Sequence, residues 1–157
     1  MTNNIDSFIA SLPSPIQNSY QNNGYKLDEE LESVCLFDGV KELLTELKKS
    51  YKLGLISNLA TPYKSPFYGL GLSIFFEKVV FSCDAGYQKP DKEIFKIMEK
   101  RVGVEKSRIL MIGDSLKSDY FGSKSIGWEA LQIVRKNTNS SVNQISSITQ
   151  LIHYLKK

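Results

Sequence analysis

From Val34 onward, apolar runs of four to six residues alternate with amphipathic stretches of about ten residues. This alternation is typical of repeated β-α units that build a parallel sheet. Residues 1–33 differ, because they are polar and rich in Asn and Ser and predict only short helices near residues 5–12 and 27–34. The pattern therefore predicts an N-terminal segment, residues 1–33, and one α/β core domain, residues 34–157.

The spacing of apolar residues assigns the elements of this core. Strands are expected at 52–57, 79–82, 108–112 and 128–134, and helices at 40–47, 91–102, 116–125 and 148–156. The helix over 91–102 has the clearest ends, since Asp91 is a good N-cap and Gly103 a good stop. We expect a sheet of four or five parallel strands.

Composition and charge exclude several classes of function. The chain has 157 residues, enough for one compact domain, and its formal net charge of +3 comes from charges of both signs along the whole chain. A dispersed charge of this size predicts neither a nucleic-acid partner nor a membrane partner. No charged leader and no membrane-spanning apolar run is visible, so we expect a cytoplasmic protein.

The cysteines and the histidine of the chain give little support to a metal site or to redox chemistry. The two cysteines, Cys35 and Cys83, have neither the number nor the spacing of a disulfide framework or a zinc site. Both stand in apolar runs, which predicts that they are core residues. The single histidine, His153, falls in the last predicted helix and is expected to be structural or solvated. An aromatic group at Phe67, Tyr68, Phe75 and Phe76 predicts core packing, or a partner surface if it is exposed.

Polar side chains follow three of the predicted strands directly. Ser57 and Asn58 follow the first, Lys89 lies in the loop after the second, and Asp114 and Asp119 follow the third. Ligands of open parallel sheets bind beyond the carboxyl ends of the strands. A hydroxyl, an ammonium and carboxylates at this edge suit a phosphate group and a hard divalent cation.

Three segments resemble the second, third and fourth motifs of the haloacid dehalogenase-like hydrolase superfamily. They are SNLA at 57–60, YQKPDKEIF at 87–95 and IGDSLKSD at 112–119. The resemblance implies a Rossmann-like fold, in which three layers are built around a parallel sheet. It also implies magnesium-dependent hydrolysis of phosphate monoesters through an aspartyl-phosphate.

The same resemblance implies a role for each matching residue. Ser57, with Asn58, would bind the phosphate, and Lys89 would steady the charges of nucleophile and phosphate as a catalytic residue. Asp114 would bind magnesium, while Asp119 would orient the neighbouring loop or join the outer shell of the metal.

The first motif of that family, Asp-x-Asp, is absent. In the family its first aspartate attacks phosphorus and its second is the general acid and base. The seven aspartates are Asp6, Asp28, Asp38, Asp84, Asp91, Asp114 and Asp119, and no two of them are separated by a single residue.

Asp38 has two interpretations. In the first, residues 34–37 (VCLF) form a strand that ends at Asp38, and Asp38 replaces the nucleophile. In the second, LFDGV is the return from a cap into the core, and Asp38 only starts a helix. We favour the second. The cap is then missing or reduced and a central strand is lost, leaving bare edges for residues 34–37, the N-terminal segment or a second chain to cover.

Three functional hypotheses follow from the missing nucleophile. The chain is an incomplete phosphatase, or a pseudoenzyme that binds a small phosphorylated molecule or a protein partner, or a fragment completed by an upstream segment that carries Asp-x-Asp. The substrate is not predicted, because specificity in this family resides mainly in the cap.

Overall fold

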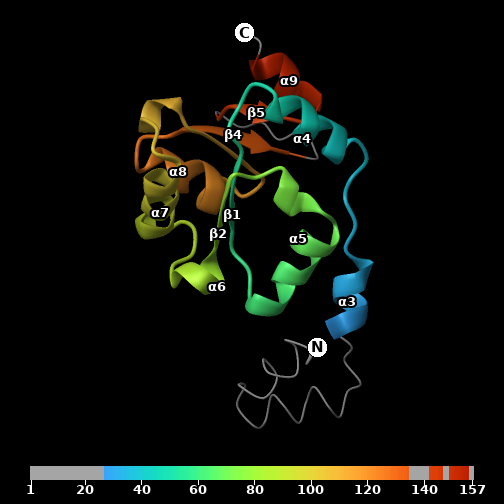
Figure 1. Ribbon diagram of the computed structural model, residues 1–157. Helices are drawn as coiled ribbons and strands as arrows, with labels where there is room; N and C mark the ends of the chain where they lie inside the picture. Colours follow the sequence, from blue (N-terminus) through green and yellow to red (C-terminus); the bar gives the residue numbers. More distant parts are fainter. Residues whose placement is uncertain (1–26, 135–141, 147–148, 156–157) are drawn as a thin grey trace.

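The computed structural model describes residues 27–134, 142–146 and 149–155, and Figure 1 shows their arrangement. In chain order the elements are α3 (Leu27–Ser33), α4 (Val40–Lys48), β1 (Gly54–Ser57), η1 (Thr61–Lys64), α5 (Ser65–Gly69), η2 (Leu72–Ile74), β2 (Lys78–Phe81), α6 (Ser82–Ala85), α7 (Lys92–Val102), η3 (Lys106–Arg108), β3 (Leu110–Gly113), the π-helical η4 (Leu116–Phe121), α8 (Gly122–Lys124), β4 (Glu129–Ile133), β5 (Gln144–Ile145) and α9 (Thr149–Leu155). The α/β fold class is confirmed. The predicted helix near 5–12 lies outside the described residues.

The strands are parallel, but they form two sheets instead of the single sheet expected from the sequence. One sheet has the order β1-β2, with Ile56 opposite Val80, and the other has the order β3-β4-β5, with Ile112 opposite Leu131. No ladder joins β1 to β3 among the described strands. In Figure 1, β1 and β2 run down the molecule, while β4 and β5 run across its upper part.

Two helical layers hold the sheets together. On one face, Phe95 and Met98 of α7 share a core with Ile56 of β1 and Val80 of β2, and Met111 of β3 packs against it. On the other face, α4 and α9 meet β4 through a second core, made of Leu43, Leu47, Leu131, Ile145 and Leu151. The first core takes apolar side chains from both sheets, and Leu53, directly before β1, packs against the second, so the expected three-layer arrangement forms although the middle layer is divided.

Helix α7 forms as the sequence predicts. The carboxylate of Asp91 accepts a hydrogen bond from the backbone N–H of Glu93 at 2.9 Å, which satisfies one of the free donors at the helix start. The helix ends at Gly103, whose φ of 63° is a left-handed conformation that glycine adopts without a Cβ clash. These two ends fix the length of the helix that packs under β1 and β2.

Residues 34–37 form no strand. They connect α3 to α4 with Val34 41% and Phe37 67% exposed. Asp38 is exposed in the turn that follows, and α4 begins two residues later, after Gly39 with a φ of 76°. The structure thus has the helix-start arrangement that we favoured, and the proposed strand ending at Asp38 is absent from it.

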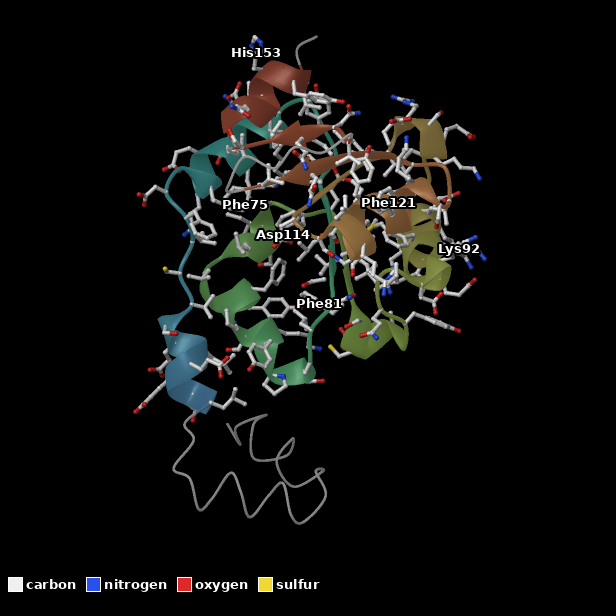
Figure 2. The ribbon with its side chains drawn as sticks, turned by 180° about the vertical axis from the view of Figure 1, so that it is seen from behind. Phe75, Phe81, Lys92, Asp114, Phe121 and His153 are labelled. Carbon is white, nitrogen blue, oxygen red and sulfur yellow. The ribbon has the colours of Figure 1, made fainter. Side chains whose placement is uncertain are left out.

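The predictions about the cysteines, the histidine and the aromatic group have different outcomes. Cys35 and Cys83 are both exposed, so their assignment to the core was wrong: an apolar run marks a buried position only where it enters a packed element. His153 is exposed at the outer end of the molecule, as expected for a solvated residue (Figure 2). In the aromatic group, Phe67 and Phe75 are buried, while Tyr68 is 59% exposed.

The helices of the described part of the chain are all too short or too polar to cross a membrane.

Phe95 links the helical layer to both halves of the fold. It is fully buried, its ring meets that of Trp128 edge-on at 5.5 Å, and Gly122 of α8 lies directly against it. We expect Phe95→Ala to lower the free energy of unfolding by about 3–5 kcal/mol, because the core loses a large ring and retains a cavity. The control is Phe121→Ala, which removes a ring that is 53% exposed and should cost less than about 1 kcal/mol. Urea unfolding compares the two, and equal losses would contradict this account.

Candidate active site

An ion pair connects the carboxyl ends of the two sheets. Lys89 lies in the loop after α6, and its Nζ is 2.6 Å from Oδ1 of Asp119 in η4. The two side chains are only 11% and 6% exposed. The same Nζ donates a hydrogen bond to the backbone oxygen of Ile56 in β1 at 3.0 Å. Lys89 therefore joins the end of β1 to the turn after β3 where no ladder does so.

Asn58 holds the backbone of the Lys89 loop. Its Nδ2 donates to the backbone oxygen of Lys89, and its Oδ1 accepts from the backbone N–H of Lys89, both at 2.8 Å. An amide can make this reciprocal pair because it carries a donor and an acceptor. The peptide bond between Lys89 and Pro90 is cis. Asn58 was predicted to bind phosphate, and in the structure both of its polar atoms contact this peptide backbone.

Asp119 orders the turn that follows β3. Its Oδ2 accepts a hydrogen bond from the backbone N–H of Ser115 at 3.0 Å, while its Oδ1 faces Lys89. The carboxylate lies so close to Gly113 that a Cβ at that position would overlap it. Ser123 in α8 donates to the backbone oxygen of Asp119 at 2.7 Å, which fixes the next turn. Orientation of the loop is one of the two roles predicted for Asp119, and both roles stay predictions.

Ser57 and Asp114 stand beside this network. Ser57 is the last residue of β1, directly after Ile56, and is half-buried. Asp114 directly follows β3, its carboxylate is exposed, and its backbone oxygen accepts a hydrogen bond from Nε2 of Gln132 at 2.9 Å. Figure 2 labels Asp114 near the middle of the molecule.

The structure thus brings together the residues expected at one edge of the sheet, but not all in the same way. Lys89 directly contacts Asn58 and Asp119, whereas Ser57 and Asp114 join through their chain neighbours Ile56 and Ser115. Asp38 is exposed in the turn that starts α4. Its catalytic role remains a prediction.

Two supporting residues were missed from the sequence. Ser82 begins α6 directly after β2, and its Oγ accepts from the N–H of Leu59 at 2.9 Å and donates to the oxygen of Leu59 at 3.1 Å. Its position at a strand end was the available signal. Gln132 lies within β4 and is 8% exposed, and a glutamine in an apolar run predicts a buried hydrogen-bond partner.

The carboxylates of the site do not form a complete metal site. No group of three or more His, Cys, Asp or Glu residues gathers within the described ranges. Both oxygens of Asp119 already accept hydrogen bonds, which leaves Asp114 as the exposed carboxylate of the two predicted metal-site residues. Magnesium normally binds through one or two carboxylates together with phosphate and water, so the residues present do not fit a tight magnesium site by themselves.

An open groove of about 410 Å³ lies elsewhere on the surface. It is lined by Thr45, Lys48, Lys49, Ile74 and Phe75, none of which is a predicted site residue. The groove therefore adds no residue to the site at the sheet edge.

The contribution of the Lys89–Asp119 pair is measurable with a double-mutant cycle. Either Lys89→Ala or Asp119→Ala alone should lower the free energy of unfolding by about 3–5 kcal/mol, because it leaves one nearly buried charge without its partner. The double variant should lose less than the sum of the two single changes, with a coupling of about 1–3 kcal/mol in urea unfolding.

The control cycle uses the exposed pair Lys96 and Glu93. Their charged atoms are also 2.6 Å apart, but the side chains are 58% and 46% exposed. Solvent screens such a pair, so its coupling should not exceed about 0.5 kcal/mol. A coupling at Lys89 and Asp119 no larger than this would show that burial adds nothing to the pair.

Comparison with known proteins shows what the chain is similar to. The family profile described as haloacid dehalogenase-like hydrolase matches residues 8–133. Glyceraldehyde 3-phosphate phosphatase of Methanothermobacter thermautotrophicus is 31% identical over 111 residues, which cover 69% of this chain and 49% of that protein. The chain therefore spans about half the length of the curated relatives it matches.

Solved structures show the same fold. A haloacid dehalogenase-family phosphatase from Thermococcus onnurineus superposes with a TM-score of 0.74 and 28% identity, covering 82% of this chain and 62% of that chain. The hydrolase YfnB of Bacillus subtilis, solved bound to magnesium, has a TM-score of 0.70 at 20% identity and covers 100% of this chain and 85% of that chain. Since the family profile extends over most of the sequence, the chain belongs to the haloacid dehalogenase-like hydrolases.

Proposed function

We propose that this chain carries the phosphate-binding part of a phosphomonoester hydrolase and lacks the carboxylate that would attack phosphorus. One observation supports this most directly: Lys89 is held at the carboxyl edge of the strands by Asp119 and by Ile56, the residue directly before Ser57. The sequence offers no Asp-x-Asp to complete the reaction. Similarity to phosphatases such as the glyceraldehyde 3-phosphate phosphatase favours a phosphate monoester as the ligand.

The ligand would bind through groups that the network leaves available. An ammonium has three donors, and two of those of Lys89 reach Asp119 and Ile56. The third would donate to a phosphate oxygen, together with the hydroxyl of Ser57. Asn58 would act indirectly, by fixing the backbone of Lys89. Phosphate binding therefore needs no group that the chain lacks.

Hydrolysis of the bound phosphate monoester would need groups beyond those that bind it. Hydrolysis through a covalent intermediate requires a nucleophile, and removing one usually forfeits several powers of ten in rate. Magnesium, when bound, would offset the charge of the phosphate. Asp114 alone would bind the metal weakly, so we assign no step of the reaction to it.

A second candidate function is that of a pseudoenzyme. The edges of β1 and β3 that pair with no other described strand favour it, because such edges bind other polypeptides. In this case the chain would bind a phosphorylated small molecule or a protein partner without turnover. We propose a cytoplasmic location and neither a nucleic-acid nor a membrane partner, since the charge of the chain is small and dispersed.

Activity is tested with the purified chain, magnesium and either an aryl phosphate or glyceraldehyde 3-phosphate. We expect no phosphate release above that of a blank preparation, because no aspartate occupies the position of the nucleophile. The same assay is run on Asp38→Asn. Robust turnover that disappears in this variant would identify Asp38 as a relocated nucleophile and overturn the proposal of an incomplete hydrolase.

Anion binding is tested by thermal unfolding in millimolar phosphate without metal. Ligand at a hundred times its dissociation constant adds about 2.7 kcal/mol, which shifts the melting temperature of a domain of this size by several degrees. Lys89→Ala and Ser57→Ala should each lose most of this shift. Phosphate also stabilises proteins by exclusion from their surfaces, so the matched control is Lys100→Ala, which removes the same charge from an exposed position of α7. Equal shifts in all four proteins would mean that there is no specific anion site.

A further inference from the structure

The chain leaves the β1-β2 sheet directly after Ser57. At the end of this parallel ladder Ser57 lies opposite Phe81, the last residue of β2. On one side the chain continues into the loop of Asn58 and Leu59, and on the other side Ser82 begins α6. The ladder thus ends at the residue proposed to bind phosphate. The loop beyond it depends on other contacts, because backbone groups that leave a ladder need new partners.

The hydroxyl of Ser82 supplies such partners. Its Oγ accepts a hydrogen bond from the N–H of Leu59 at 2.9 Å and donates one to the oxygen of Leu59 at 3.1 Å. A serine hydroxyl can do both, because it carries one donor and two acceptor lone pairs. One half-buried side chain therefore binds both backbone groups of a residue in the loop after β1.

Leu59 is one of three positions of this segment that are held by residues following β2. The Nζ of Lys89 binds the oxygen of Ile56, and the backbone of Lys89 pairs with the side-chain amide of Asn58. Together with the hydroxyl bonds at Leu59, these contacts fix the chain on both sides of Ser57. The place of the Ser57 side chain is thus determined by its neighbours in the sequence.

A second contact from α6 reaches the same segment further along the chain. The Nζ of Lys64, at the end of η1, is 2.8 Å from Oδ1 of Asp84, and the two side chains are 23% and 55% exposed. Solvent screens a pair of this kind, so it adds little to the order of the segment. Ser82 reaches the chain two residues after Ser57, whereas Lys64 is seven residues away. Ser82 is therefore the contact of α6 that acts on the anion site.

We propose that Ser82 is a positioning residue of the anion site and acts through Ser57. By holding Leu59, its hydroxyl keeps the Ser57 side chain in the orientation that a phosphate on Lys89 requires. Ser82 itself does not touch the phosphate. The inference rests on the proposed function, because it requires phosphate to bind at these residues. It adds a residue that lies outside the three segments with family-like motifs.

The test measures the dissociation constant of inorganic phosphate by NMR titration of the full chain and its Ser82 variants. Ser82→Ala should weaken binding about tenfold, since a misplaced Ser57 loses its hydrogen bond to a charged oxygen. Ser82→Thr keeps the hydroxyl and should bind within about threefold of the wild type. Ser82→Cys, whose thiol is a weak donor, should fall between them and replaces Ser82→Ala if that variant does not fold.

The matched control is Ser125→Ala. The hydroxyl of Ser125 also donates to a backbone oxygen, that of Gly122, at 2.7 Å. Its loss should change the dissociation constant by less than about twofold, because it makes no contact with the loop after β1.

Amide hydrogen exchange at Leu59 reports the contact itself in the absence of phosphate. Exchange should be about tenfold faster in Ser82→Ala than in the wild type and should stay slow in Ser82→Thr. Exchange at Met98, inside α7, is the reference for the stability of the whole domain. Phosphate affinity should follow the protection of Leu59 across the variants. A purely structural role would change the exchange at Met98 and leave the affinity of the folded chain unaltered.

A double-mutant cycle tests whether Ser82 acts through Ser57. In a Ser57→Ala background, Ser82→Ala should change the dissociation constant by less than about twofold, because the side chain that it positions is gone. A full tenfold effect in this background would overturn the inference.

The remaining outcomes separate this inference from the proposed function. Phosphate binding by the wild type with an unchanged dissociation constant in Ser82→Ala would overturn the inference and leave the proposed function intact. Weak binding by any Ser82 variant in which Leu59 is still protected would also overturn the inference alone. Absence of phosphate binding by the wild type would overturn the proposed function, and the role of Ser82 with it.

Discussion

The ion pair between Lys89 and Asp119 is the interaction on which the arrangement of the site depends. Two sheets that share no backbone ladder meet at their carboxyl ends through this pair and through the bond from Lys89 to Ile56. The core beneath α7 supports the same contact, because it takes side chains from both sheets. A buried pair of charges costs desolvation, and here that cost is offset by hydrogen bonds to both carboxylate oxygens.

The hydrogen bonds around Lys89 and Asp119 order two loops at the carboxyl ends of the strands. The residues that hold the loops are satisfied among themselves: Asn58 with the Lys89 backbone, and Asp119 with Lys89 and Ser115. Ser57 ends β1 and Asp114 directly follows β3, and neither side chain takes part in these bonds. The order of these two loops therefore rests on contacts made within this chain.

Local patterns predicted most of the described fold. Asp91 and Gly103 marked the ends of α7, and each predicted strand lies within two residues of an observed one. The sequence indicated a division of the sheet only indirectly, through the absence of the Asp-x-Asp motif. Local patterns do not show which strands pair, since pairing depends on residues distant in sequence. The exposure of Cys35 and the short strand β5 were not predicted, because both depend on tertiary packing instead of on local hydrophobicity.

Gly113 has a consequence for how the sequence of this site can change. Any side chain there would displace the Asp119 carboxylate, which lies against its Cα. The displaced carboxylate would leave the Lys89 ammonium without its counter-ion and add an unbalanced positive charge at the carboxyl edge. One methyl group in a turn can thus alter the electrostatic potential that an approaching anion meets, so residues 113 and 119 are expected to vary together in evolution.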